Sequence, residues 1–399
     1  MPNAEELIKK HRTDDVHQLS LQWHGMPQAT WMIEQVEGWQ RLKKKVPSWA
    51  AIDSLHFPKR LSVEQCSSEQ TAKYKVEVVR SRLEKMPRPT VMADITGGFG
   101  VDCSFLSRLA SQAFYVERDT ALCETMKHNA PLLQLSNLSV INEDGTEWLK
   151  HQKHLDLIYI DPARRSDHGK KLISMTDCEP NVVNLLPLLR EKARCVLLKL
   201  SPMLDISLAL KQLENHVEEV HIVASDGECK ELLMLLDMQK STETPIIICT
   251  DGKELLRFTI SEEAALSANA LTEESYYASE LGQFLFEPNA TILKAGAFHT
   301  VAHRFGVQKL HPNTHLYTAN AQKNDFPGRK FKIKQAVDFS KKELKSLMGR
   351  QVNLSVRNLH GTTDILRKKL KLHDGGAEYW FATTYFPSKK GIIICEKLP

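Results

Sequence analysis

The amino-acid sequence predicts an α/β fold with a seven-stranded, doubly wound sheet whose last strand is antiparallel. Strand-like apolar runs alternate with helical segments between residues 90 and 240, which is typical of a largely parallel sheet. The first run ends in a glycine-rich turn, as expected where a strand passes into a helix beside a ligand. The last two runs, 217–223 and 231–237, have a link too short for a crossover, so they predict a hairpin and a reversed final strand.

Residues 1–85 are predicted to be helical and to precede the sheet. Four tryptophans there indicate that these helices pack on one another or on the sheet: Trp23, Trp31, Trp39 and Trp49. Ser67 or Ser68 can cap a helix that continues through Arg80. Polar residues at this helix start either cap and pack it or contact a ligand: Gln65, Ser68 and Thr71.

The glycine turn lies in the stretch 93–102, which reads as the end of a buried strand followed by the start of a helix. It contains the pattern Asp-x-Thr-x-Gly-x-Gly, formed by Asp94, Thr96, Gly98 and Gly100. Glycines there let the backbone approach a ligand that a Cβ would exclude. Taken alone, the pattern also fits a nicotinamide-binding fold or a turn without a ligand. The residues that follow the later strands are needed to distinguish these possibilities.

Two further acidic residues follow the second and third predicted strands. Glu117 lies in the run 113–119, and its carboxylate can accept hydrogen bonds from both hydroxyls of a ribose. Asp144 follows the run 138–142 and is placed to accept from an adenine amine, with Gly145 leaving room for the ring. The alternatives are a plain neighbour of a helix cap for Glu117 and an ordinary turn for Asp144.

The fourth and fifth strands end in residues suited to a reactive site. The run 155–160 leads into a short segment made of Asp161, Pro162, Ala163, Arg164 and Arg165. The run 195–200 contains Lys199 and stops before a Ser-Pro pair. Because ligands bind outside the carboxyl ends of the strands in such sheets, all these residues are expected along one edge. A plain strand stop is the alternative for the Asp-Pro pair.

The order of these motifs resembles the class I methyltransferases, which use S-adenosylmethionine (SAM), and the reversed seventh strand agrees with that family. The resemblance implies SAM as cofactor. It also implies these contacts with SAM: Asp94, Thr96, Gly98 and Gly100 for the methionine part, Glu117 for the ribose, Asp144 for the adenine, and Gln65, Ser68 and Thr71 for the carboxylate.

The resemblance places the methyl acceptor at Asp161 and Pro162. Many amino-methyltransferases carry an Asp-Pro-Pro-aromatic motif there, whose acidic side chain and proline carbonyl accept hydrogens from the target amine. Here Ala163 and Arg164 replace the second proline and the aromatic residue, which departs from a standard adenine N6 or cytosine N4 site and is closer to variants among RNA methyltransferases. The fifth strand has no cysteine after it, which argues against a cysteine nucleophile.

The C-terminal third carries a second resemblance, in the strings 286–290, 294–298 and 309–317. They resemble a ferredoxin-like insert of a bacterial methyltransferase family that ends in a THUMP-like domain. The resemblance covers nearly the whole chain and implies RNA, either tRNA or rRNA, as partner. It divides the chain into a helical part (1–85), a SAM-binding domain (86–262), a ferredoxin-like insert (276–320) and a THUMP-like RNA-docking domain (321–399).

Basic charge is concentrated near the C-terminus. Residues 320–399 contain 17 Lys or Arg and 7 Asp or Glu, although the whole chain has a formal net charge of only +4. This asymmetry favours a polyanion bound through its phosphates, with a merely solvated surface as the alternative. The predicted phosphate contacts are Lys330 and Lys332 on a basic strand face, and Arg164, Arg165 and Lys199 near the acceptor.

Other features exclude several classes of protein. The sequence has no apolar run of about 18 residues and no secretory pattern, so no membrane span and a cytoplasmic location are predicted. The eight cysteines form no Cys-x-x-Cys pair and are expected to be reduced. The histidine pairs at 299 and 303 and at 311 and 315 lack neighbouring ligands, so no metal is expected. The oligomeric state stays open.

Together the patterns predict a SAM-dependent methyltransferase that acts on a nitrogen of an RNA base, with Asp161 and Pro162 as the catalytic residues. Two alternatives remain from the sequence. One is a protein that binds SAM and RNA without catalysis, and the other is a nicotinamide-dependent oxidoreductase.

Overall fold

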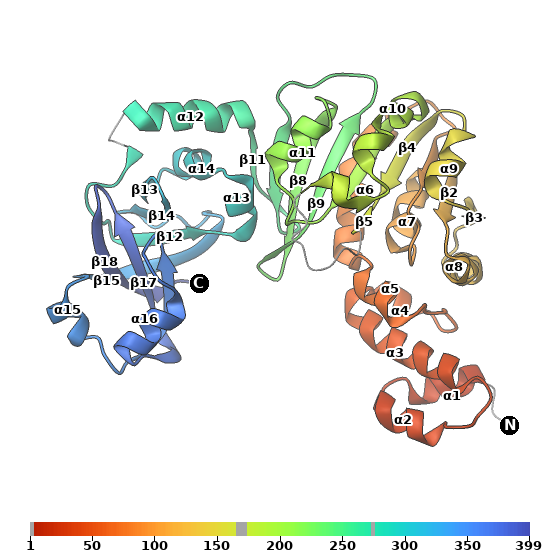
Figure 1. The fold of residues 1–399 in the computed structure, drawn as a ribbon, viewed down its shortest axis with the longest axis horizontal. Coiled ribbons are helices and arrows are strands. Elements are labelled where there is room, and N and C mark those ends of the chain that lie inside the picture. Colours follow the sequence, from red (N-terminus) through yellow and green to blue (C-terminus); the bar gives the residue numbers. More distant parts are fainter. Residues whose placement is uncertain (1–3, 165–173, 273–275) are drawn as a thin grey trace. The chain divides into compact units, whose positions relative to one another are not determined.

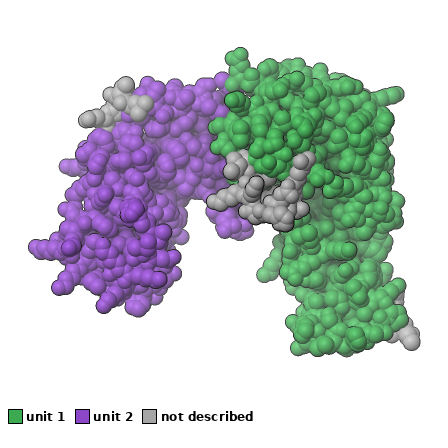
Figure 2. Space-filling view, in the orientation of Figure 1, with its two compact units in different colours: residues 1–220, 231–243 green, residues 221–230, 244–399 purple. Residues whose placement is uncertain are grey.

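The computed structural model describes residues 4–164, 174–272 and 276–399 (Figure 1). The chain forms two compact units, residues 1–220 with 231–243 and residues 221–230 with 244–399 (Figure 2). The division passes through one β-hairpin, whose outer end belongs to the second unit. The domain limits expected from the sequence stay a prediction.

The first unit begins with the helical part that the sequence predicts. Its helices are α1 (Ala4–His11), α2 (Val16–Gln22), α3 (Ala29–Lys45), α4 (Pro47–Ala50), α5 (Arg60–Gln65) and α6 (Glu69–Leu83). Side-chain caps fix two of the starts: Asp15 accepts from the backbone N–H of Gln18 before α2, and Ser68 accepts from that of Thr71 before α6.

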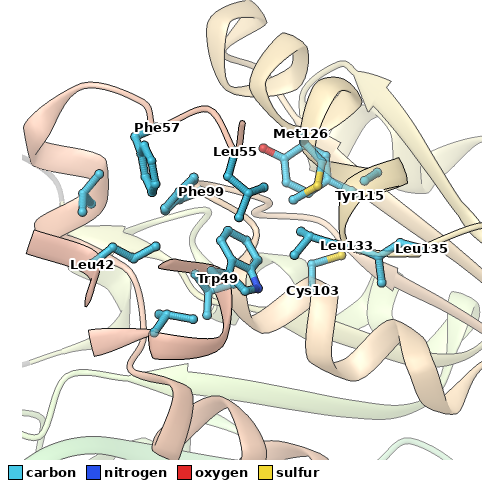
Figure 3. Close-up of a cluster of buried hydrophobic side chains, with 14 of the residues drawn as sticks. Leu42, Trp49, Leu55, Phe57, Phe99, Cys103, Tyr115, Met126, Leu133 and Leu135 are labelled. Carbon is cyan, nitrogen blue, oxygen red and sulfur yellow. The ribbon is translucent and has the colours of Figure 1, made fainter. Parts of the chain in front are cut away.

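A buried apolar cluster packs these helices against the glycine turn (Figure 3). The ring of Trp49 in α4 meets the ring of Phe99 in the turn edge-on, with 5.2 Å between the ring centres. Phe57 lies 6.4 Å from the same ring, and Tyr115 and Met126 belong to the same cluster. Since aromatic side chains bury large apolar areas, this cluster fixes the helical part to the turn.

The sheet of the first unit has the strand order β3-β2-β1-β4-β7-β9-β8. Its strands are β1 (Val91–Asp94), β2 (Gln112–Glu117), β3 (Leu138–Asn142), β4 (Leu155–Ile160), β7 (Ala193–Leu200), β8 (Val217–Ser225) and β9 (Glu228–Asp237). Strand β1 pairs in parallel with β2 and β4, and β4 pairs in parallel with β7. Strand β9 runs antiparallel to β7, so the predicted reversed last strand is confirmed.

Helices connect the parallel strands of this sheet. They are α7 (Val101–Leu106), α8 (Thr120–Leu132), α9 (Gly145–Lys150), α10 (Val182–Lys192) and α11 (Ile206–Gln212), with the short elements η1 (Ser107–Leu109), β5 (Ala163–Arg164), η2 (Met175–Asp177) and β6 (Cys178–Glu179). The carboxylates of Asp119, Asp144 and Asp205 accept from backbone N–H groups at the starts of α8, α9 and α11. Anionic caps suit these positions because helix N-termini carry partial positive charge.

A further hairpin, with Asp251 and Gly252 in its turn, is formed by β10 (Ile246–Thr250) and β11 (Glu254–Thr259), which pair antiparallel. These two strands follow β8 in the sheet order, so the sheet has nine strands within the described residues, two beyond the seven predicted. Four of the five residues of β10 are buried, so this apolar strand is covered on both faces.

The described residues of the second unit form a separate sheet of order β13-β14-β12-β15-β18-β17-β16. Its strands are β12 (Phe284–Pro288), β13 (Gln308–His311), β14 (Thr314–Ala319), β15 (Gly328–Asp338), β16 (Gln351–Arg357), β17 (His373–Tyr385) and β18 (Lys389–Lys397). Its helices are α12 (Ile260–Thr272), α13 (Ala290–Ala295), α14 (Phe298–Phe305), α15 (Lys341–Lys345) and α16 (Thr363–Leu370). Leu285 of β12 lies opposite Phe331 of β15, and both are fully buried, so the predicted insert and docking domain share one sheet.

Candidate functional site

Asp94 ends β1 and anchors the glycine turn. Only 1% of it is exposed, and its Oδ1 accepts hydrogen bonds from the backbone N–H of Thr96 (3.0 Å) and from the hydroxyl of Thr96 (3.3 Å). Burial raises the pKa of Asp94 well above its ordinary value, and the charges of Asp102 and Asp161 add to this. The turn is therefore built around a carboxyl group that lies close to two other carboxylates.

The two glycines of the pattern have different roles. Both adopt left-handed backbone angles, with φ of +55° at Gly98 and +83° at Gly100. A Cβ on Gly100 would lie 1.8 Å from Cε of Met126, the flexible end of that side chain, so the left-handed backbone is the main reason for glycine at this position. A Cβ on Gly98 would meet, among the described atoms, nothing nearer than the carbonyl oxygen of Thr96 at 3.7 Å. Gly98 thus presents open backbone, which a ligand-binding turn needs.

Glu117 ends β2 and contacts the same turn. Its Oε2 accepts from the backbone N–H of Gly98 at 2.8 Å, and its Oε1 accepts from that of Asp119 at 2.9 Å. The first bond brings the end of the second strand onto the glycine turn, at the edge where the sequence places it. Each carboxylate oxygen can accept a second hydrogen bond, so Glu117 keeps acceptor capacity for two ribose hydroxyls.

Asp144 is exposed and caps α9, where its Oδ1 accepts from the backbone N–H groups of Thr146 (2.9 Å) and Glu147 (3.1 Å). Gly145 has a structural reason that the sequence did not predict. A Cβ on Gly145 would lie 2.0 Å from the carbonyl oxygen of Ile95, so the absent side chain makes space for the glycine turn. Space for an adenine ring stays a prediction. An adenine contact of Asp144 stays a prediction.

Asp161 follows β4 and is held from two sides. Its backbone N–H donates to the hydroxyl oxygen of Thr96 at 2.8 Å, and its Oδ2 accepts from Nζ of Lys199 at 2.5 Å. The ends of β1, β4 and β7 therefore meet at this residue, and Pro162 follows it, partly exposed. Arg164 lies in β5, and Arg165 lies outside the described residues.

Lys199 points at Asp161, whereas the sequence predicts a phosphate contact for it. Its side chain is 15% exposed, against 37% for Asp161. Burial alone would lower the pKa of Lys199, but the carboxylates of Asp161, Asp102 and Glu231 outweigh burial and raise that pKa. Lys199 is therefore a cation inside a group of carboxylates.

A buried ionic cluster beside this site was missed at the level of sequence. Lys75 of α6 is fully buried and binds Glu231 of β9 at 2.8 Å and Asp102 of α7 at 3.1 Å. The hydroxyls of Ser67 and Tyr159 each donate to Oδ2 of Asp102 at 2.7 Å. One signal was available, because helical spacing from the apolar Ala72 and Val79 puts position 75 on the buried face of α6.

The three residues predicted for the SAM carboxylate lie around the start of α6. Ser68 is its N-cap, and the hydroxyl of the buried Thr71 donates to the carbonyl of Ser68 at 3.2 Å. Gln65 ends α5 and is exposed. Ser67, between Gln65 and Ser68, accepts from Lys75 at 3.1 Å and so ties this segment to the ionic cluster. The cap is observed, and the contact with a ligand stays a prediction.

The basic strand of the second unit is β15, and its predicted alternation is confirmed around Phe331, which is buried. Lys332 is exposed, whereas Nζ of Lys330 donates to the carbonyl of Asn324 at 2.9 Å. Lys334 lies 3.5 Å from the carboxylate of Glu396. Of the predicted phosphate contacts on this strand, Lys332 is thus the most accessible to a ligand.

Some of the basic surplus is committed to structure. The buried carboxylate of Glu287 binds Arg329 of β15 and also Arg357 of β16, the latter at 2.9 Å. The net charge of the last 80 residues therefore overstates the charge that this unit offers to a polyanion.

The thiols, the possible metal ligands and the helix lengths bear on other classes of protein. All eight cysteines are free thiols, and six of them are buried. Among the described residues, no cluster of three His, Cys, Asp or Glu side chains suits a metal ion. Within that same part of the chain, every helix is too short or too polar to cross a membrane.

Three family models match parts of the chain. One described as conserved hypothetical protein 95 matches residues 82–179, a ferredoxin-like domain matches 284–327, and a THUMP-like domain matches 328–397. A comparison with curated protein sequences finds no match.

Solved structures give the wider comparison. A crystal structure of a candidate methyltransferase from Porphyromonas gingivalis W83 is 34% identical, with a TM-score of 0.85, over 99% of this chain and 98% of that one. The candidate methyltransferase yhhF of Escherichia coli is 15% identical, with a TM-score of 0.32, over 43% and 87%. A candidate RNA methyltransferase of Pyrococcus horikoshii is 17% identical, with a TM-score of 0.29, over 40% and 73%. On the identity and full-length coverage of the first, the chain belongs to the family of class I methyltransferases that carry a THUMP-like domain at the C-terminus.

Proposed function

We propose that the protein is a SAM-dependent methyltransferase that modifies an amine nitrogen of an RNA base in tRNA or rRNA. The observation that carries this proposal is the position of Asp161. Its backbone is bonded to the glycine turn through Thr96, and its carboxylate is held by Lys199. A residue suited to orient an acceptor thus adjoins the turn suited to hold a methyl donor.

The residues present fit SAM. Gly98 offers open backbone at the turn, and Glu117 beside it has acceptor capacity for the hydroxyls of a ribose. Asp94, Thr96 and Gly100 shape this turn, Asp144 lies at the end of the third strand, and Gln65, Ser68 and Thr71 lie before the first strand. SAM, when bound, would supply a methyl group carried by a positively charged sulfur.

The chain's own contribution is alignment. Methyl transfer is an in-line displacement: the acceptor nitrogen bonds to the methyl carbon while the bond between that carbon and sulfur breaks, its electrons staying on sulfur. The Oδ1 of Asp161 and the carbonyl of Pro162 would accept hydrogens of the amine and so aim its lone pair. The alkylated nitrogen then releases one proton, which needs no strong base.

RNA as substrate is supported by the THUMP-like match and by the basic composition of residues 320–399. Lys332 is the best placed phosphate contact on β15, and Lys330, Arg164 and Arg165 are further candidates. Contacts of this kind supply affinity that salt weakens, without reading sequence.

A second candidate function is a protein that binds SAM and RNA without catalysis. The observation in its favour is the replacement of the usual aromatic residue after the Asp-Pro pair by Arg164. A nicotinamide-dependent oxidoreductase loses its support, because the chain belongs to a family of methyltransferases.

The test is transfer of labelled methyl from SAM to RNA, DNA and protein taken from cells that lack this gene. Label in a fraction sensitive to ribonuclease supports the proposal, and Asp161→Ala should abolish transfer while SAM still binds. Label only in protein would reject RNA as the substrate. SAM binding without transfer to any fraction would favour the non-catalytic alternative.

A further inference from the structure

We propose that Lys199 is a positioning residue for Asp161 and not a phosphate contact, and that it holds the carboxylate in the orientation that receives the acceptor amine. The inference rests on the proposed function and deepens it. It names a residue outside the Asp-Pro motif on which the orientation of Asp161 depends.

The geometry fixes the Asp161 carboxylate in one orientation. Its Oδ2 lies 2.5 Å from Nζ of Lys199, and its backbone N–H is bonded to Thr96. The cation is the more buried of the two groups, so Lys199 approaches from inside the protein and leaves the outer side of the carboxylate to a substrate. A phosphate would have to displace this contact in order to reach Lys199.

The surrounding charges explain why Lys199 is directed at Asp161. The carboxylates near it are Asp161 after β4, Asp102 in α7 and Glu231 in β9, and the N-terminal helical part contributes Lys45 and the thiol of Cys66. Lys75 already binds both Asp102 and Glu231. Asp161 is therefore the carboxylate left for direct contact with Lys199. Because the raised pKa keeps Lys199 protonated, it cannot itself serve as a base.

The pairing has a consequence for the substrate. Oδ2 of Asp161 is occupied by Nζ of Lys199, and an ionised carboxylate only accepts hydrogen bonds. It attracts an N–H group and repels a bare nitrogen lone pair. An exocyclic amine fits this site, because it keeps a hydrogen for Asp161 while its lone pair faces the methyl group. A ring nitrogen without hydrogen does not fit.

The test is a double-mutant cycle on methyl transfer with Lys199→Met and Asp161→Asn, using the RNA fraction that accepts label. Lys199→Met should lower kcat by roughly tenfold or more, with KM for RNA and the dissociation constant of SAM within about twofold. Lys199→Arg should restore most of the rate. In the Asp161→Asn background Lys199→Met should change the rate by less than about twofold, because it acts through Asp161.

Two controls separate this result from loss of folding. Lys211→Met removes an exposed lysine of α11 and should leave the rate unchanged. If Lys199→Met lowers the melting temperature markedly, Lys199→Gln, which keeps a donor, replaces it in the cycle.

Three outcomes would contradict the inference or the function on which it rests. A raised KM for RNA that depends on salt, together with multiplicative effects in the cycle, would make Lys199 a phosphate contact and overturn the inference. Modified RNA that carries the methyl on a ring nitrogen would overturn the assignment of an amine as the acceptor. Wild-type protein that binds SAM and transfers nothing would overturn the proposed function, and this inference with it.

Discussion

The backbone N–H of Asp161 donates to the hydroxyl oxygen of Thr96 at 2.8 Å, and that hydroxyl in turn donates to Asp94 at 3.3 Å. The bond joins the turn after β4 to the turn after β1, two strands that pair in parallel. Thr96 is predicted from the sequence to contact SAM. In the structure its hydroxyl is already used in these two hydrogen bonds within the protein, which set the distance between the glycine turn and the Asp-Pro pair.

Replacing Thr96 with Val should therefore reduce methyl transfer more than SAM binding. Val removes the acceptor and leaves the N–H of Asp161 without its partner, and a small displacement of a reacting group can cost on the order of 100-fold in rate. Single-turnover transfer and SAM titration measure the two effects. Thr96→Ser, which keeps the hydroxyl, is the control, and equal rates for the Val and wild-type proteins would contradict the prediction.

Lys75→Met should strongly destabilise the first unit. It leaves the buried carboxylates of Asp102 and Glu231 without their cation, and breaking a buried pair in this way typically costs about 3–5 kcal/mol. Urea unfolding of the full chain measures the loss. Lys73→Met is the matched control, because Lys73 lies on the same helix but its side chain is 62% exposed. If both variants lose a similar free energy of unfolding, the buried ionic cluster contributes little to stability.

Gly145→Ala should lower stability even without any ligand. The new Cβ would lie 2.0 Å from a backbone oxygen, so α9 or the glycine turn has to move, and overpacking of this kind costs about 1–3 kcal/mol. Thermal unfolding of the SAM-free protein measures it, with the neighbouring Thr146→Ala as control. An unchanged melting temperature with weakened SAM binding would instead show that Gly145 makes space for the adenine ring.

The second unit should lose stability in mild acid through His315. Burial, aided by the charges of Lys309 and His299, lowers the pKa of His315 from 6.5 to about 4. Between these values the unfolded chain binds a proton that the folded chain does not, so stability falls as the pH drops from 6.5 towards 4. The ring centres of His315 and Phe298 lie 3.7 Å apart. His315→Phe keeps a ring in this contact and should flatten the dependence of stability on pH.

The measurement is the melting temperature of both proteins across that pH range, together with hydrogen exchange in β14, which contains His315. Equal pH slopes for the two proteins would rule out His315 as the source of the acid sensitivity.

Reversing the charge of Lys332 should weaken RNA binding without changing SAM binding. Lys332→Glu removes one phosphate contact and should reduce the slope of log affinity against log salt by about one. Lys332→Arg keeps the charge and serves as the control. An unchanged salt slope would move the RNA-binding surface away from β15.

The ends of the strands could be predicted from the sequence, because an apolar run followed by a polar residue marks a carboxyl end in a parallel sheet. Asp94, Glu117 and Asp161 were found on that basis and lie on or beside the turns of the site. The pairing of Lys75 with Glu231 spans 156 positions and depends on how α6 docks on β9, which no local pattern encodes. The orientation of Lys199 likewise depends on three distant carboxylates.

The pairing of β12 with β15 has a consequence for how the protein is made. As the chain leaves the ribosome, β12 and β14 can pair first, but the other edge of β12 stays uncovered until residues 328–338 have been synthesised. An uncovered strand edge is open to wrong partners. The ferredoxin-like and THUMP-like segments must therefore complete their folding together. A gene that kept one without the other would encode a sheet with an unpaired strand edge.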